Sequence, residues 1–226
     1  MSDTLRPDLE LIAQLIPQDS RVLDLGCGNG ELLRLLMRKG CTGTGVEIEP
    51  AELVEALRSG VNVIDLDLNS ELGEFADDSY DVVVLSRTLQ NVHKPREVLE
   101  QISRIAVHCV VSMPNFAHWS SRARLLTGRM PMSKDLPYPW YDTPNLHYTS
   151  LKDLEPLFRS LDLQIDRCIP LNARGEAHVM GNAAANLLAS SAVYLLHAQR
   201  QSASLGSMPT GVTDPRARTN NRTSHR

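Results

Sequence analysis

The feature that most constrains this chain is an alternation that runs from Arg21 to Asn115. Short runs rich in Val, Ile and Leu are separated by stretches with apolar residues at helical spacing. Nearly continuous apolar runs of this length are typical of strands covered on both faces, and strands that alternate with helices predict a parallel, doubly wound α/β sheet. The predicted strands are residues 21–25, 42–48, 61–68, 80–86 and 108–113.

The intervening segments carry the expected signals for helix ends. "GELLRLLMRKG" ends at Gly40 and "EPAELVEALRSG" ends at Gly60, and glycine is favoured just past the end of a helix. "PREVLEQISRIA" begins at Pro95, which suits a first helical turn. One more amphipathic helix is predicted near the N-terminus, closed before Pro17.

The loop after the first predicted strand is unusually rich in glycine. "RVLDLGCGNGELLRLL" places Gly26, Gly28 and Gly30 between a strand and a helix, where missing side chains let a ligand approach the backbone. The helix N-terminus adds free N–H groups and partial positive charge. The spacing is G-x-G-x-G rather than the G-x-G-x-x-G of dinucleotide-binding loops, and Asp24 stands two places before the first glycine. A carboxylate suits a ligand with an amino group and a sulfonium better than it suits a phosphate.

The stretch "VLDLGCGNG" resembles the cofactor loop of class I S-adenosylmethionine-dependent methyltransferases. The resemblance implies a Rossmann-like fold with a mostly parallel, doubly wound, seven-stranded sheet and helices on both faces, binding S-adenosylmethionine or S-adenosylhomocysteine. It also implies that Glu47, with Glu49 as the nearby alternative, binds the ribose hydroxyls, and that Asp67 faces the adenine with Leu68 packed on the ring. The predicted cofactor-binding residues are Asp24, Gly26, Cys27, Gly28, Gly30, Glu47, Ile48, Asp67, Leu68 and Ser86.

Three longer stretches resemble the MetW family of methionine biosynthesis proteins over residues 5 to 198. The most specific parts are "PNFAHW" and "LPYPWYDTPNLH", which lie within "VVSMPNFAHWSSRARLLTGRMP" and "LPYPWYDTPNLHYTSLKDLEPL"; the third stretch is "LSRTLQNVHKPREVLEQISRI". The resemblance implies an accessory or regulatory partner of homoserine O-acyltransferase. The alternative is a stand-alone methyltransferase that acts on a small metabolite or a protein side chain.

No convincing catalytic pair follows the fourth and fifth predicted strands. His93 precedes Lys94 and Pro95 at a helix start, so a surface histidine is expected there. The position at which base-modifying methyltransferases carry an Asp/Asn-Pro-Pro-aromatic stretch reads "SRTL", and the net charge is −4, so a nucleic-acid substrate is not expected. The polar residues considered for acceptor chemistry are Ser86, Arg87, Gln90, His93, Asn115 and His118.

The cysteines give no sign of a metal site. No C-x-x-C pair occurs, and none of the four lies near a histidine at metal-ligand spacing. Reduced thiols are expected, with Cys27 filling space in the loop. These cysteines are Cys27, Cys41, Cys109 and Cys168.

Residues 116–148 differ in composition from the rest of the chain. They hold six of the ten aromatic residues and four prolines, so they cannot form one regular helix. Two interpretations stay open: a loop packed on the sheet edge, or a lid or partner-docking surface, for which Arg122, Arg124 and Arg129 are further candidates.

The remaining segments complete one predicted domain over residues 1–200. Residues 150–161 predict a helix with Ser150 as N-cap, residues 162–171 predict a half-exposed strand, and residues 183–199 predict a helix, a strand or part of each. Residues 201–226 are polar and are expected to be a disordered tail. We find no secretory signal and no apolar run long enough for a bilayer, so a cytoplasmic protein without membrane contact is expected.

Overall fold

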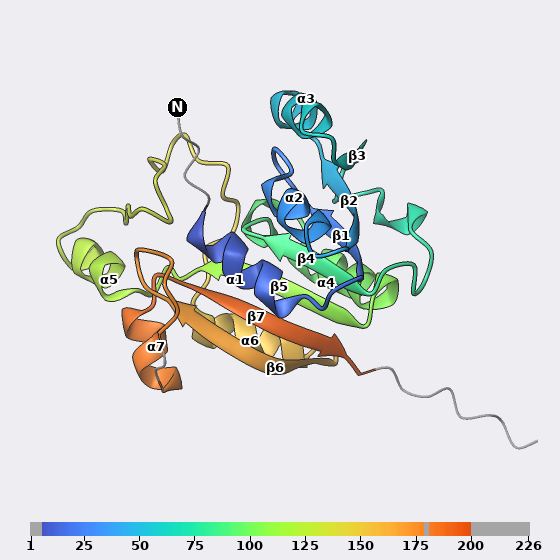
Figure 1. The fold of residues 1–226 in the computed structure, drawn as a ribbon. Coiled ribbons are helices and arrows are strands. Elements are labelled where there is room, and N and C mark those ends of the chain that lie inside the picture. The colour runs from blue at the N-terminus through green and yellow to red at the C-terminus, as the bar shows by residue number, and fades with distance from the viewer. Residues whose placement is uncertain (1–5, 179–180, 200–226) are drawn as a thin grey trace, which may run out of the picture.

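The computed structural model describes residues 6–178 and 181–199 (Figure 1). Its strands are β1 (Arg21–Leu25), β2 (Thr42–Glu47), β3 (Asn62–Asp65), β4 (Val82–Ser86), β5 (His108–Pro114), β6 (Leu163–Leu171) and β7 (Ser191–Ala198). Its helices are α1 (Pro7–Leu15), α2 (Glu31–Met37), α3 (Pro50–Arg58), α4 (Pro95–Ile105), α5 (Trp119–Leu126), α6 (Leu151–Arg159) and α7 (Asn182–Leu188), with short 3₁₀ turns η1 (Leu72–Glu74) and η2 (Leu89–Asn91).

The seven strands form one sheet in the order β3-β2-β1-β4-β5-β7-β6. The pairs from β3 to β5 are parallel, whereas β7 runs antiparallel to both β5 and β6. The predicted fold class, a mostly parallel, doubly wound, seven-stranded sheet, is confirmed. The strand order reverses between β1 and β4, and ligands of such sheets bind at this reversal, outside the carboxyl ends of the strands.

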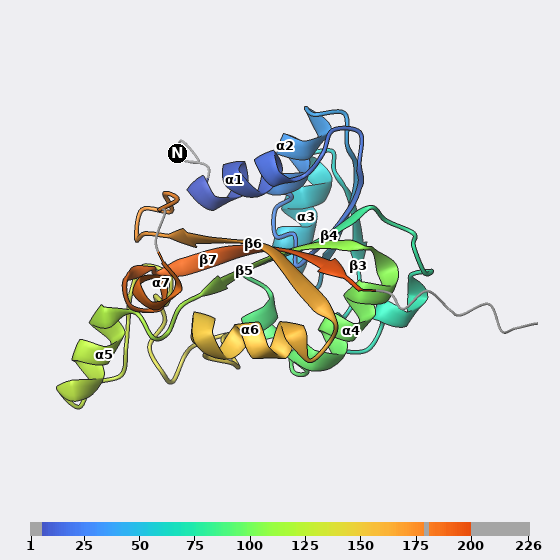
Figure 2. The same ribbon diagram turned by 90° about the horizontal axis from the view of Figure 1, so that it is seen from below.

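Helices cover both faces of the sheet, and each face has its own core. Figure 2 shows α1 and α2 on one side of the sheet and α4 and α6 on the other. On the first side Ile12 and Leu36 pack on the sheet, and on the second Ile102 and Phe158 do so. The helical spacing of these apolar residues in the sequence reflects this one-sided burial.

The outer strands differ from the prediction that the apolar runs are covered on both faces. The residues of β4 are all buried, but β3 is largely exposed because it lies at the sheet edge. The third predicted strand also ends early, at Asp65 rather than at residue 68. Asp67 therefore lies after the end of β3, where its carboxylate accepts a hydrogen bond from the Asn69 N–H.

The C-terminal half resolves what periodicity left open. Residues 183–199 divide into α7 and β7, and Ser150 caps α6 by accepting a hydrogen bond from the Asp153 N–H at 3.1 Å. Within residues 116–148 the only regular element is α5. The predicted tail, residues 201–226, lies outside the described residues.

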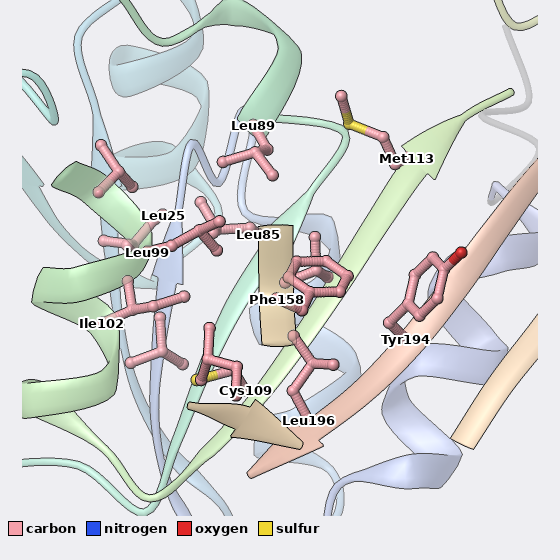
Figure 3. Packing of buried hydrophobic residues seen from close by; sticks show 14 of the residues in the cluster. Leu25, Leu85, Leu89, Leu99, Ile102, Cys109, Met113, Phe158, Tyr194 and Leu196 are labelled. Atoms are coloured by element: carbon pink, nitrogen blue, oxygen red, sulfur yellow. The ribbon is translucent and has the colours of Figure 1, made fainter. Parts of the chain in front are cut away.

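The core beneath α4 and α6 predicts a clear difference between two substitutions. Phe158 is fully buried and its ring meets Tyr194 edge to face, with centroids 5.3 Å apart (Figure 3). Phe158→Ala should lower the free energy of unfolding by roughly 3–5 kcal/mol because it leaves a cavity. Leu126→Ala, at a side chain that is 88% exposed, should change it by less than about 0.5 kcal/mol. Urea denaturation measures both, and equal losses would contradict the packing described.

Candidate functional site

The glycine loop joins β1 to α2, and its glycines serve two different purposes. All three adopt positive φ: 73° at Gly26, 53° at Gly28 and 78° at Gly30. A Cβ at Gly26 would lie 2.6 Å from Thr88 Oγ1, and one at Gly30 would lie 2.5 Å from a methyl group of Val61. A Cβ at Gly28 would meet only Glu52 Oε2, at 3.6 Å. Two of the glycines thus allow the protein to pack on itself, and Gly28 leaves open space beside the backbone.

Glu47 at the end of β2 holds this loop in place. Its carboxylate accepts hydrogen bonds from the N–H of Gly28 at 2.8 Å, of Ile48 at 2.9 Å and of Glu49 at 3.0 Å. The Val46 carbonyl accepts two more, from the N–H groups of Gly26 and Cys27. Parallel pairing of β1 with β2 brings these groups together, although they are some 20 residues apart in the sequence.

Asp24 is the least satisfied polar group of the site. Its side chain, on β1, is buried, and its Oδ1 has no hydrogen-bond partner in the described structure. Burial raises the pKa of Asp24 to about 7; the positive charge of Arg6 opposes this rise and the charge of Glu47 adds to it. An unpartnered buried acceptor is costly, so this geometry favours a ligand that brings a donor or a positive charge.

Two adjoining hollows open above the carboxyl ends of the strands. The smaller, about 260 Å³, surrounds the glycine loop and Asp24, and the larger, about 480 Å³, extends past Glu47 and Asp67. Among the predicted cofactor-binding residues, Gly30 lines neither hollow, because it lies under Val61 at the start of α2. The residues that do line them are Asp24, Gly26, Cys27, Gly28, Glu47, Ile48, Asp67, Leu68 and Ser86.

The outer end of the larger hollow is shaped by the turn after β3. Asp67 Oδ1 accepts hydrogen bonds from the N–H of Asn69 at 2.9 Å and from its Nδ2 at 2.7 Å, and these bonds lower the pKa of Asp67. Oδ2 accepts a longer bond from Ser70 Oγ at 3.3 Å. Ile48, more than half exposed, and Leu68 add apolar surface beside it. A flat ring with polar edges fits this combination.

An ion-pair chain closes the other side of the site and was not predicted. Arg6 donates to Asp8 at 2.8 Å and to Ser86 Oγ at 2.9 Å, and Arg87 contacts both Asp8, at 3.2 Å, and Asp135, at 2.8 Å. Burial works to raise the pKa of Asp8, but the bonds and charges of the two arginines lower it on balance. The sequence signal is weak, because the four residues come from three separate segments.

The polar residues considered for acceptor chemistry divide into two groups. Ser86 and Arg87 line the larger hollow, and Arg87 has a positive φ of 59°. The other four lie elsewhere or have structural contacts. Asn115 Nδ2 donates to the carbonyls of Asn186 and Ala189. The remaining three are Gln90, which donates to the Arg87 carbonyl, His93, which is exposed as predicted, and His118, which caps α5.

The four cysteines are free, and Cys27 fills space beneath the loop as predicted. Cys27 is buried beneath the loop, its Sγ lies 2.5 Å from where a Cβ on Gly45 would be, and burial raises the pKa of its thiol. Across residues 6–178 and 181–199 no group of three His, Cys, Asp or Glu side chains could hold a metal ion. In the same residues no helix has the length and apolar character needed to cross a bilayer.

Solved structures with this architecture include S-adenosylmethionine-dependent methyltransferases. The one from Mesorhizobium loti superposes with a TM-score of 0.63 at 16% identity, over 84% of this chain and 97% of that one. The one from Methanosarcina mazei gives 0.62 at 16% identity, over 84% of this chain and 98% of that one. The chain therefore has the Rossmann-like fold of class I methyltransferases.

Sequence comparison assigns the family. The model for methionine biosynthesis protein MetW matches residues 6–196, and the chain belongs to this MetW family. The bifunctional methionine biosynthesis protein MetXA/MetW of Rhodopirellula baltica is 34% identical over 209 residues, 88% of this chain and 34% of that protein. A ubiquinone biosynthesis O-methyltransferase of Pseudomonas fluorescens is 36% identical over 90 residues, 38% of this chain and 39% of that protein. The chain thus spans between a third and two fifths of the length of these relatives.

The buried Asp24 predicts an unusual pH dependence of stability. Its pKa is about 7 in the folded protein and 3.8 ordinarily, so between these values the folded state holds a proton that the unfolded state has lost. The stability that the neutral side chain contributes is therefore complete below about pH 4 and disappears as the pH rises through about 7.

Asp24→Asn should consequently stabilise the ligand-free protein at pH 8, by roughly 1–3 kcal/mol, and the gain should shrink toward pH 5. Thermal and urea unfolding across this pH range measure the effect. Asp67→Asn, at a partly exposed carboxylate with a lowered pKa, serves as the control and should show no such gain. If Asp24→Asn changes the free energy of unfolding by the same amount at every pH, the raised pKa of Asp24 is contradicted.

Proposed function

We propose that the two hollows form one binding site for S-adenosylmethionine or S-adenosylhomocysteine. The observation that carries the proposal is the unpartnered, buried Oδ1 of Asp24 beside the open backbone at Gly28. An ammonium group donates to such an oxygen and stabilises its charge, which removes the cost of ionising Asp24 in the fold.

The rest of the site supports the same ligand. Glu47 lies between the loop and the larger hollow, where its Oε2, which already accepts from the Gly28 N–H, can also accept from a ribose hydroxyl. Ile48 and Leu68 offer apolar surface for an adenine, whose amino group would face Asp67. Five carboxylates line the two hollows against two arginines, Arg6 and Arg87, so a ligand with ammonium and sulfonium charges is matched electrostatically.

We propose further that the protein is an accessory or regulatory partner of homoserine O-acyltransferase rather than a stand-alone enzyme. In the relative from Rhodopirellula baltica a MetW region shares one polypeptide with a MetXA region, which supports physical association of the two. The placement of Asn115 and His118 in backbone contacts supports a role that needs no general base.

The alternative, a methyltransferase acting on a small metabolite or a protein side chain, is favoured by one observation. Ser86 and Arg87 line the larger hollow, where they could orient an acceptor. Proximity alone supplies much of the acceleration in a displacement at a sulfonium methyl, so the scarcity of acid–base groups does not exclude this alternative.

The docking surface that we propose is the segment 116–148. Trp140 is 70% exposed and Tyr141 is 74% exposed, and Trp119 is more than half exposed. Phe116 instead packs on Tyr148, with centroids 4.9 Å apart. Exposed aromatic side chains, with Arg122 and Arg124 nearby, have the composition of interface hot spots.

Binding of the nucleoside should depend on Glu47 and not on its neighbour. Isothermal titration calorimetry with S-adenosylhomocysteine should detect binding to the unaltered protein, and Glu47→Gln should weaken it at least about tenfold, because a charge-assisted acceptor for the ribose is lost. Glu49→Gln is the matched control, since Glu49 is exposed and lines neither hollow. No heat with the unaltered protein refutes the proposed ligand, and the reverse order of the two variants assigns the ribose to Glu49.

The accessory role predicts a gain in acyl transfer without consumption of cofactor. The purified protein should raise the rate of the acyltransferase on homoserine, while methyl release from labelled S-adenosylmethionine stays at background with cell extract as acceptor. Alanine at Trp119, Trp140 and Tyr141 should abolish co-purification, whereas Leu187→Ala, exposed on α7, should not. Sustained methyl turnover on a defined acceptor would establish the alternative.

A further inference from the structure

The part of the proposed docking surface that follows α5 is attached to the loop after β4 at two places. At the first, Leu136 is buried and Asp135 pairs with Arg87 at 2.8 Å. At the second, the N–H groups of Leu146 and His147 both donate to the carbonyl of Gln90, at 2.9 and 3.0 Å. The partners of these contacts, Arg87 and Gln90, lie in the loop after β4, and this loop also lines the larger hollow.

Between these points lies a tip, residues 137–144, with few ties to the rest of the protein. Its hydrogen bonds within the described chain are local: Asp142 N–H donates to the Pro139 carbonyl, and Thr143 Oγ1 accepts from the adjacent Asn145 N–H. Proline at 137, 139 and 144 fixes φ at three of eight positions. The prolines therefore restrict the backbone on both sides of Tyr138 and at the end of the tip, whereas few hydrogen bonds hold the tip to the rest of the protein.

Tyr138 is the tip residue that reaches the site. It lines the larger hollow together with Glu47, Ile48 and Asp67, yet it remains 48% exposed. Two and three residues further on, Trp140 and Tyr141 stack edge to face, with centroids 5.6 Å apart, and face solvent. A single short segment thus supplies a wall of the ligand pocket and the most exposed aromatic pair of the docking surface.

We infer that this tip couples the two sites: a nucleoside bound against Tyr138 fixes the position of Trp140 and Tyr141 for the acyltransferase. The inference rests on the proposed function and adds the direction in which the nucleoside changes binding of the partner. Ordering the tip before docking removes an entropic cost of association, so the nucleoside strengthens binding of the partner. By linkage the partner strengthens binding of the nucleoside by the same factor, typically about 5-fold or more.

The protein carries its own reporter for this coupling, since Trp119 and Trp140 are its only tryptophans. In a Trp119→Phe background, S-adenosylhomocysteine should raise the anisotropy and shift the emission of Trp140. Tyr138→Ala should abolish that response while calorimetry still detects binding, weakened by no more than about tenfold. Tyr138→Phe is the matched control and should retain the response, because the ring is kept.

A second variant tests the stiffness of the tip without touching the pocket. Pro139→Gly frees the backbone between Tyr138 and Trp140, so it should leave affinity for S-adenosylhomocysteine unchanged and reduce the Trp140 response. Biolayer interferometry measures affinity for the partner in the protein that keeps Trp119. S-adenosylhomocysteine should raise this affinity at least about 5-fold in the unaltered protein and in Tyr138→Phe. It should not raise the affinity in Tyr138→Ala.

The outcomes separate this inference from the proposed function. Absence of binding heat in the unaltered protein defeats the proposed ligand and the coupling together. Binding heat with a silent Trp140, or a partner affinity in Tyr138→Ala that still responds to S-adenosylhomocysteine, overturns the coupling alone. Circular dichroism establishes whether each variant is folded. If Tyr138→Ala does not fold, the Trp140 response is compared between Tyr138→Phe, which should retain it, and Pro139→Gly, which should reduce it.

Discussion

The hydrogen bonds between the end of β2 and the loop after β1 position everything else in the site. The Glu47 carboxylate accepts a hydrogen bond from the N–H of Gly28, and the Val46 carbonyl accepts hydrogen bonds from the N–H groups of Gly26 and Cys27. These bonds satisfy amides that would otherwise face an unfilled hollow, and they fix the loop in a conformation with positive φ. Without them, neither the open backbone at Gly28 nor the pocket beside it would be defined.

The electrostatics of the site follow from where this loop places charge. Asp24 is buried beneath the loop with one oxygen unpartnered, so its ionised form is disfavoured until a positive group arrives. On the other side, Arg6 donates its hydrogen bonds to Asp8 and Ser86, and it donates none to the unpartnered Oδ1 of Asp24. The site is thus arranged to be stabilised by a cationic ligand, at a cost to the ligand-free fold.

A methyltransferase fold does not by itself imply methyl transfer. In this member of the MetW family, several polar residues near the strand ends hold the chain together. Asn115 donates to a carbonyl in the loop before β7, and Gln90 bonds both to Arg87 and to the segment 116–148. A hollow whose wall is also part of an exposed aromatic segment is consistent with the accessory role that we propose.

The sequence by itself determined the strand–helix alternation, the glycine loop, the ends of α2 and α3 shortly before Gly40 and Gly60, and the residues that gather at the strand ends. It could do so because apolar periodicity and glycine punctuation are local, and because parallel strands end at one edge. Only the tertiary structure decided that Gly26 and Gly30 make room for Thr88 and Val61, that residues 183–199 divide between a helix and a strand, and that Arg87 joins Asp8 to Asp135. Each of these depends on contacts between segments far apart in the chain, and such contacts leave no periodic mark in the sequence.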